Sequence, residues 1–287
     1  MIVSLASIRP WLRRLKPGNR APRDSGKAPG AAIDLPAVPG TVAFVCNLCG
    51  TPNTVAPAEL SRETPSCRRC ASTVRFRAVA HLVCTELLGC DATLTELPVH
   101  NNLRGIGLSD DDRYARALAA HFDYTNTWFD AQPKLDITRP PESMIGQYDF
   151  LIASDVFEHV APPIEIAFIN ARRLLKPGGV FIFTVPFSLD AATVEHFPEL
   201  NEFHLEQRNG QWTLHNITRD GRTESFGNLV FHGGPGSTLE MRLFSQAGLM
   251  QQFAAAGFSS WRIASEPCAA HGIAWPEPWS VPVVAIA

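Results

Sequence analysis

The stretch Asp149-Phe-Leu-Ile-Ala-Ser-Asp155 is a short apolar run closed by an acid, a pattern typical of a strand that is buried on both faces. A helix is predicted over 163–175, because its apolar residues recur at helical spacing and Pro177-Gly178-Gly179 stops it. The apolar run 180–185 predicts a second buried strand. Strand, helix and strand at this spacing form a right-handed crossover unit, so the sequence predicts an α/β fold around a largely parallel sheet.

Strands and helices alternate on both sides of this unit. Before it, the residue pattern predicts a helix over 76–88, a strand over 92–97, a helix over 110–122 with Ser109 as its N-cap, and strands over 124–129 and 134–137. After it, a polar, irregular stretch over 190–240 is expected to hold strands near 211–217 and 228–231. A last helix is predicted over 246–256, with Gly257 as its C-terminal cap.

Four of the seven cysteines form two C-x-x-C pairs, Cys46 with Cys49 and Cys67 with Cys70, separated by seventeen residues. This is a zinc-binding spacing, because each pair offers two thiolates to one side of a tetrahedral ion. Four thiolates leave no open coordination position, so the sequence predicts a structural zinc ion and not a catalytic one. No partner pattern is visible for the other three cysteines, which are Cys84, Cys90 and Cys268.

The charge balance excludes some classes of protein. The 287-residue chain has a formal net charge of −3, which argues against an electrostatic nucleic-acid binder, and no apolar run approaches the length of a membrane span. Residues 1–40 are basic and rich in proline and glycine, which predicts a flexible tail; the alternative is an amphipathic helix over 1–15 that touches an anionic membrane or a partner. Basic residues from Arg9 to Lys16 interrupt any secretory signal, so a cytoplasmic protein is expected.

Acidic residues follow several of the predicted strands. In an open α/β sheet, ligands bind beyond the carboxyl ends of the strands. The segment 103–110 carries two glycines and runs into a helix start, Asp136 ends a short strand, and Asp155 precedes the acid–imidazole pair Glu158-His159. Each signal is weak alone, but their order along one alternating unit indicates a ligand site at this edge of the sheet.

The central run is specific enough to resemble a known family. Residues 148–160 followed by 173–187 look like class I S-adenosylmethionine-dependent methyltransferases, and the nearest branch is the methyltransferase-11/type-12 group with its run "fDlv…EHv…LkpGG". The resemblance covers about residues 92–260. It implies a Rossmann-like, seven-stranded sheet flanked by helices, with an antiparallel final strand supplied here by a hairpin of 261–264 and 280–286.

One departure from the family concerns the glycine-rich loop after the first strand. Its usual form, acid-x-G-x-G-x-G, is absent. Either Glu96 opens a lengthened loop that reaches Gly105 and Gly107, or the segment 105–109 is the second strand and the first loop is degenerate. We prefer the first placement, because 124–130 then serves as the second strand.

The resemblance implies roles for individual residues. Asp130 is expected to bind the ribose hydroxyls of S-adenosylmethionine, Asp136 to accept from its adenine amino group, and Asp155 to line its methionine end. His159 is the candidate base for an acceptor that must lose a proton, with Glu158 orienting it; the structural alternative is that Glu158 caps a helix and His159 packs against it. The full set of expected cofactor-binding residues is Glu96, Gly105, Gly107, Asp130, Asp136 and Asp155.

Three parts are therefore predicted: the tail over 1–40, a zinc-ribbon-like four-cysteine domain over 41–75, and a methyltransferase domain over 76–287. The expected function is methyl transfer from S-adenosylmethionine to an unidentified acceptor, with a small molecule or a glycan favoured. The alternative is a module whose zinc knuckle binds protein or nucleic acid beside a degenerate methyltransferase domain, favoured by a local basic bias from Arg62, Arg68, Arg69, Arg75 and Arg77. A nicotinamide dehydrogenase is disfavoured, because no G-x-G-x-x-G follows the first strand.

Overall fold

The computed structural model describes residues 40–233 and 236–287. The described residues form two compact units, one made of 40–194 and 243–287 and the other of 195–242 without residues 234–235. The tail predicted over 1–40 and the alternative helix over 1–15 lie outside the described residues, apart from Gly40. The four-cysteine segment falls in the same unit as the central sheet, and the domain boundary expected at residue 75 stays a prediction.

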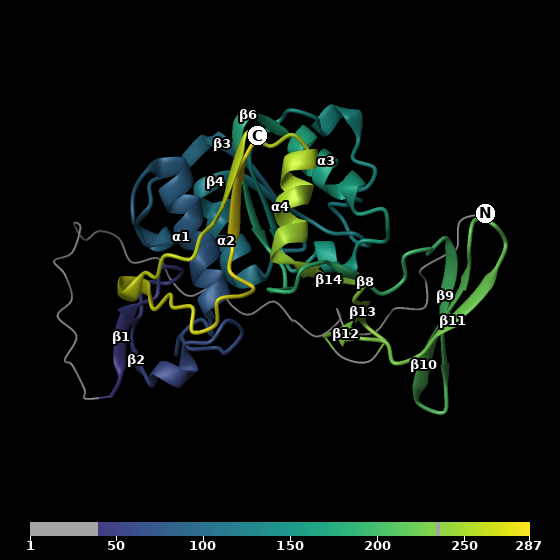
Figure 1. Ribbon diagram of the computed structural model, residues 1–287. Helices are drawn as coiled ribbons and strands as arrows, with labels where there is room; N and C mark the ends of the chain where they lie inside the picture. Colours follow the sequence, from purple (N-terminus) through teal and green to yellow (C-terminus); the bar gives the residue numbers. More distant parts are fainter. Residues whose placement is uncertain (1–39, 234–235) are drawn as a thin grey trace. The chain divides into compact units, whose positions relative to one another are not determined.

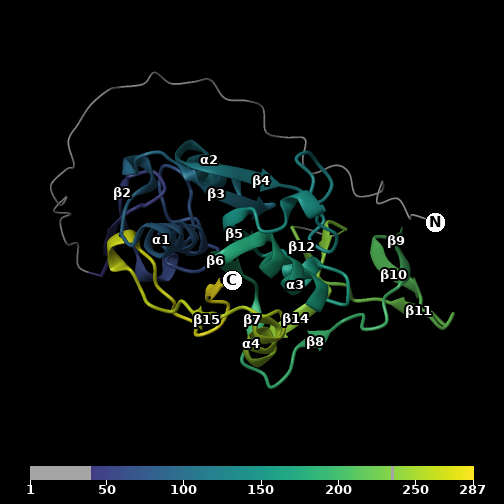
Figure 2. The same ribbon diagram turned by 90° about the horizontal axis from the view of Figure 1, so that it is seen from above.

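A six-stranded sheet forms the centre of the larger unit, within the residues described (Figures 1 and 2). Its order is β15-β16-β6-β5-β3-β4. β16 runs antiparallel to its neighbours β15 and β6, whereas β6, β5, β3 and β4 are parallel to one another. The strands span Ser260–Ile263 (β15), Val283–Ile286 (β16), Leu175–Thr184 (β6), Tyr148–Ser154 (β5), His100–Leu108 (β3) and Phe122–Thr127 (β4). The mostly parallel α/β sheet and the antiparallel last hairpin are confirmed.

Helices cover both faces of this sheet, as Figure 2 shows. They are α1 (Val74–Leu88), α2 (Asp112–His121), α3 (Glu165–Leu174) and α4 (Gln246–Ala255). Phe150 and Ile152 of β5 pack in one core with α1 and α2, whereas Leu151 and Ala153 pack in another core with α3 and α4. This alternation is why β5 reads as a continuous apolar run. No helix in the described part of the chain is long and apolar enough to cross a membrane.

The first strand differs from its prediction. It is β3, not 92–97, which instead contains a 3₁₀ helix at Leu94–Glu96. Leu94 and Leu97 are buried against the core of α1 and α2, so their apolar character reflects the packing of this turn and not strand alternation. Only the last four residues of β3 are buried, so the sequence of this strand lacks the apolar run that would have predicted it.

The predicted strand over 134–137 is also wrong. Only an isolated bridge between Trp128 and Lys134 forms there, so the sheet has six strands and not the expected seven among the described residues. Asp136 explains the difference: its Oδ1 accepts from the backbone N–H of Thr138 at 2.9 Å, and its carbonyl accepts from Arg139 N. These two bonds turn the chain away from the sheet edge.

Two helix ends test the capping predictions. The N-cap of α2 is Asp111 and not Ser109, since the Asp111 carboxylate accepts from the backbone N–H of Arg113 at 2.9 Å. Gly257 has a φ of +82° directly after α4 and its C-cap, as expected of a helix-terminating glycine. The other predicted helices agree with the structure to within two residues.

The four-cysteine segment consists of a hairpin, β1 (Val42–Val45) with β2 (Pro52–Val55), and two tight turns that carry the C-x-x-C pairs. Arg77 on α1 joins this segment to the rest of the unit. Its fully buried guanidinium donates to the carbonyls of Ser72 and Gly272, each at 2.9 Å, and to Ser66 Oγ at 3.0 Å. The segment therefore packs as part of the larger unit.

The smaller unit is a β structure of its own. Its meander has the order β11 (Thr223–Phe226), β10 (Gln211–Ile217), β9 (Glu202–Arg208), and a short hairpin joins β12 (Phe231–His232) to β13 (Thr238–Leu239). The strand expected at 211–217 is confirmed, and the one expected near 228–231 begins later.

The remaining strands are β7 (Phe187–Ser188), β8 (Val194–Glu195) and β14 (Arg242–Ser245).

Candidate functional site

The carboxyl ends of β3 and β5 make sharp turns at the same edge of the sheet. Ser109 after β3 and Asp155 after β5 both have positive φ angles, 55° and 57°. Backbone bonds hold both turns, since Ser109 N donates to Thr127 O at 2.7 Å and Asp155 N donates to Thr184 O at 2.8 Å. Non-glycine residues rarely adopt this conformation, and such residues cluster at functional sites.

Asp110 is buried at the end of β3. Its Oδ1 accepts from the hydroxyl of Tyr114 at 2.6 Å, and its Oδ2 accepts from the hydroxyl of Tyr124. Burial raises the pKa of Asp110 to about 7, although the two tyrosine hydrogen bonds oppose the rise. Its carboxyl group is thus enclosed by its own neighbours.

Asp155 is bound by two arginines from the cysteine-bearing part of the chain. Arg62 donates from Nη1 to Oδ2 at 2.9 Å and from Nη2 to Oδ1 at 2.6 Å, and Arg75 Nε lies 3.2 Å from Oδ2. Thr184 Oγ1 donates to Oδ1 at 3.0 Å. Burial opposes ionisation, but the arginine charges outweigh it and lower the pKa of Asp155 to about 2. Its acceptor positions are therefore occupied by groups of the same chain.

Arg62 and Arg75 are the site residues that the sequence reasoning assigned differently. They were part of the local basic bias, but their side chains are only 16% and 12% exposed and they pair within the chain. Arg77 is fully buried, which leaves Arg68 and Arg69 as the exposed members of the set. Nothing in the sequence near Arg62 points to Asp155, which lies 93 positions away.

Gly105 and Gly107 lie inside β3 and not in a loop. A Cβ atom on Gly105 would lie 2.1 Å from Cζ of Phe150, and one on Gly107 would lie 1.9 Å from the hydroxyl oxygen of Tyr124. Both glycines are thus needed because aromatic side chains of neighbouring strands lie against the β3 backbone. Glu96 is exposed in the 3₁₀ helix that precedes the amino end of β3, so no lengthened loop joins it to these glycines.

Asp130 and Asp136 follow β4 and remain more accessible. Asp130 is exposed, and Asp136 is half-buried with its Oδ1 accepting from both the backbone N–H and the hydroxyl of Thr138. No donor among residues 40–233 and 236–287 reaches Asp136 Oδ2. Asn170 of α3 holds this segment in place by donating to the carbonyls of Ile137 and Thr138, at 2.9 and 3.1 Å.

Glu158 and His159 lie in a 3₁₀ helix (Phe157–His159) just beyond β5. Oε1 of Glu158 is 3.6 Å from Nε2 of His159, and the Glu158 side chain is fully buried. Burial and the nearby charge of Asp155 raise the pKa of Glu158 well above its usual range. The structure thus brings the two residues together, as their adjacency in the sequence suggests.

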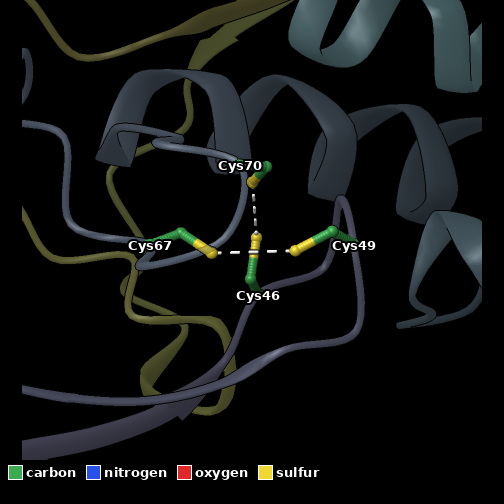
Figure 3. A group of neighbouring side chains, drawn as sticks. All are labelled: Cys46, Cys49, Cys67 and Cys70. Atoms are coloured by element: carbon green, nitrogen blue, oxygen red, sulfur yellow. Dashed lines mark hydrogen bonds between the residues drawn. The ribbon is translucent and has the colours of Figure 1, made fainter. Parts of the chain in front are cut away.

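The four cysteines of the two C-x-x-C pairs converge on one point, as Figure 3 shows. Sγ of Cys46 is 3.6 Å from Sγ of Cys70, Sγ of Cys49 is 3.6 Å from Sγ of Cys67, and all four sulfur atoms lie within 4.8 Å of one another. Zinc–sulfur bonds of about 2.3 Å in a tetrahedron place the sulfur atoms about 3.8 Å apart. The arrangement fits a tetrahedral ion with only small shifts.

Comparison with known families covers the segment that builds this sheet edge. Residues 76–181, from α1 into β6, match the family model described as "Methyltransferase domain". Residues 76–181 are a methyltransferase domain. This match covers less than half of the 287-residue chain, and it does not identify a methyl acceptor.

Individual relatives extend the comparison. A "Highly reducing polyketide synthase sor1" of Hypocrea jecorina (strain QM6a) is 41% identical over 66 residues, which cover 21% of this chain and 3% of that protein. Among solved structures, the citrinin polyketide synthase CMeT domain is similar with a TM-score of 0.40 and 12% identity, over 75% of this chain and 52% of that chain. The S-adenosylmethionine-bound amino pentose methyltransferase CalS10 from Micromonospora echinaspora is similar with a TM-score of 0.37 and 14% identity, over 64% and 83% of the two chains. Likenesses at this level carry no argument about the acceptor.

Proposed function

We propose that this chain is an S-adenosylmethionine-dependent methyltransferase that acts on a small-molecule or glycan acceptor, and that its cofactor binds on the β4 side of the sheet edge. The observation that supports this placement is the difference between the strand-end acids. Asp155 is held by two arginines, whereas Asp130 is exposed and Asp136 keeps one carboxylate oxygen without a donor in the described part of the chain.

The residues after β4 fit the cofactor by their chemistry. Bound S-adenosylmethionine would supply an activated methyl group on a sulfonium. Asp136 would accept from the adenine amino group, and the Asp130 carboxylate would accept from the ribose hydroxyls. Asp155 then acts mainly by holding Arg62 and Arg75, which fixes the end of the four-cysteine segment beside the sheet.

Charge supports a small acceptor. Binding a nucleic acid requires several basic side chains that contact phosphates. Three of the five arginines between residues 62 and 77 are held inside the chain, and the net charge is −3. The internal pairing of these arginines therefore removes most of the support for the nucleic-acid-binding alternative.

His159 is proposed as the group that accepts a proton from the acceptor, with Glu158 positioning its ring. Methyl transfer is an in-line displacement in which alignment supplies much of the rate, so a base acts only when the acceptor must lose a proton. Oε1 of Glu158 lies 3.6 Å from Nε2 of His159, which is within the distance of an ion pair.

The four cysteines are proposed to hold a structural zinc ion. Their mutual distances match a tetrahedral site, and four thiolates leave no position for substrate. In this arrangement the ion stabilises the segment that presents Arg62 and Arg75 to Asp155.

The acceptor is tested by incubating the full chain with methyl-labelled S-adenosylmethionine and lysate fractions separated into small molecules, glycans, proteins and nucleic acids. We expect the label in the small-molecule or glycan fraction. Label in protein or nucleic acid would contradict the proposed acceptor class. An absence of cofactor binding together with tight capture of a protein partner would favour the binding-module alternative.

The cofactor placement is tested with Asp136→Asn. We expect about tenfold weaker binding of S-adenosylhomocysteine by calorimetry, because an amide replaces the carboxylate that accepts from the adenine. Asp123→Asn is the matched control, since Asp123 is an exposed residue of β4 whose pair with Arg104 lies at the strand's amino end. Equal affinities for the Asp136→Asn variant and the unchanged protein would place the cofactor elsewhere.

The zinc ion is tested with Cys49→Ser. We expect the loss of one zinc ion per chain by mass spectrometry and a fall of about 10 °C in the thermal midpoint, because metal binding contributes directly to folding. Cys90→Ser is the control, since Cys90 is exposed and outside the cluster. An unchanged zinc content in Cys49→Ser would rule out this site.

A further inference from the structure

A second group of metal-ligand side chains lies in the larger unit, apart from the four cysteines. It consists of His81 on α1, Asp91 just after α1, and Cys268 and His271 at a 3₁₀ helix (Ala269–His271) between β15 and β16. One ligand atom from each of the four residues lies within 4.8 Å of the others. Residues up to 190 positions apart in the sequence therefore converge here.

The contacts centre on the Asp91 carboxylate. Its Oδ1 lies 3.0 Å from Nδ1 of His81 and 2.9 Å from Nε2 of His271, and its Oδ2 lies 3.8 Å from Sγ of Cys268. Zinc bonds of about 2.0–2.3 Å would place tetrahedral ligand atoms roughly 3.3–3.8 Å apart. The measured distances of 2.9–3.8 Å, and the limit of 4.8 Å on the other pairs, lie near this range.

The orientation of His271 suits metal binding through its Nε2. Its Nδ1 lies 2.9 Å from the carbonyl oxygen of Val45, which only accepts, so Nδ1 carries the ring proton. Nε2, the nitrogen that would bind a metal, then faces the carboxylate of Asp91. Metal-bound histidines characteristically donate their other N–H to a carbonyl in this way.

The loop that carries Cys268 and His271 is held rigidly. Cys268 and Ile273 exchange backbone hydrogen bonds of 3.0 and 2.9 Å, and the carbonyl of Gly272 accepts from Arg77 at 2.9 Å. Preorganised side chains of this kind favour metal binding, because little order has to be gained on binding.

The site also has a route for an ion to enter. His81 lines a cavity of about 250 Å³, together with Glu86 and Arg262. Asp91 itself is 47% exposed. An ion can thus reach ligands that are otherwise half-buried.

We propose that His81, Asp91, Cys268 and His271 bind a second zinc ion, and that this ion is structural. Two imidazoles, a thiolate and a carboxylate form a donor set that suits zinc, and four protein ligands close its coordination sphere. The ion would tie the loop between β15 and β16 to α1. Through His271 and Val45 it would also brace β1 directly before Cys46.

The zinc content of the full chain tests this site. The double variant His81→Ala/Cys268→Ala should contain one zinc ion per chain fewer than the unchanged protein, after dialysis of both against the same buffer. Glu86→Gln, on the same helix and the same cavity, is the matched control and should keep the full content. Because the readout is a difference, it does not depend on whether the four cysteines bind zinc. Equal zinc contents of the double variant and the unchanged protein would overturn the proposal.

Cadmium-113 NMR of the unchanged protein provides a second measurement that needs no variant. We expect a resonance in the range of mixed nitrogen, oxygen and sulfur ligation, separate from any resonance of a four-sulfur site. A spectrum without a mixed-ligand resonance at two or more equivalents of cadmium would overturn the proposal even if the double variant failed to fold.

Discussion

Asp110 and Asp155 follow two neighbouring parallel strands at the same edge of the sheet, yet their surroundings are opposite. Asp110 is enclosed by two tyrosine hydroxyls, and burial raises its pKa to about 7. Asp155 is half-buried, and although burial opposes ionisation, Arg62 and Arg75 lower its pKa to about 2. The charge of a strand-end acid thus depends on which distant side chains reach it and not on its place in the strand–turn pattern.

This difference also bears on the ligand site. An acid at a strand end is commonly read as a ligand contact, but both of these carboxylates are already bonded within the chain. The acids after β4 are the more accessible ones. Substitutions at each acid, and in the packing around Asp110, test how their surroundings set their charge.

Gly107→Ala should have the largest effect. The added Cβ would lie 1.9 Å from the Tyr124 hydroxyl oxygen and 2.2 Å from Oδ2 of Asp110, so the buried pair must separate. We expect a loss of about 3 kcal/mol in the free energy of unfolding, measured by urea denaturation. Gly227→Ala is the control, since nothing lies within 4 Å of its added Cβ. A loss below that of the control would show that this packing is not tight.

Asp155→Asn should have an intermediate effect. We expect a loss of about 2 kcal/mol at pH 7, because the folded pKa of about 2 lies below the usual value of 3.8. A lowered pKa stabilises the fold above the unfolded-state pKa, and this stabilisation disappears as the pH falls from about 4 towards 2. The difference in unfolding free energy between the unchanged protein and the variant should therefore shrink in that window. A difference that stays constant there would exclude the ion pairs as its source.

Asp110→Asn should have the smallest effect and the opposite pH dependence. The raised pKa means that the folded chain binds the Asp110 proton more tightly than the unfolded chain, so the unchanged protein loses stability as the pH rises from about 4 to about 7. The variant lacks this loss, and we expect its stability relative to the unchanged protein to rise by about 1 kcal/mol between pH 5 and pH 6. Urea midpoints at four pH values measure this, and a flat difference would contradict the raised pKa.

The crossover unit was predictable, whereas the first strand was not. Residues 149–155 and 180–185 are buried on both faces, so their apolar runs signal strands directly. β3 begins with His-Asn-Asn and is buried only from Gly105 onward, and its glycines suggest a loop in the sequence. Glycine is needed at these positions because the rings of Phe150 and Tyr124 on neighbouring strands lie against the β3 backbone. The local sequence of β3 gives no sign of these contacts between strands.

The same limit applies to the candidate site. The four-cysteine cluster could be predicted because each C-x-x-C pair places two of its four cysteines close together in the sequence. The pairing of Arg62 with Asp155 and the convergence of His81, Asp91, Cys268 and His271 depend on tertiary contacts alone. Cys268 therefore had no visible partner in the sequence.

The position of β16 has a consequence for the order of folding. This strand lies near the end of the chain described here, yet it is inserted between β15 and β6 inside the sheet. Arg62 also donates to the carbonyl of Ser280, 218 positions away, while holding Asp155. Contacts of such long sequence separation form slowly, because a long loop must close first. The contacts that join the four-cysteine segment and α1 to Gly272 and Ser280 therefore belong to the slow part of folding.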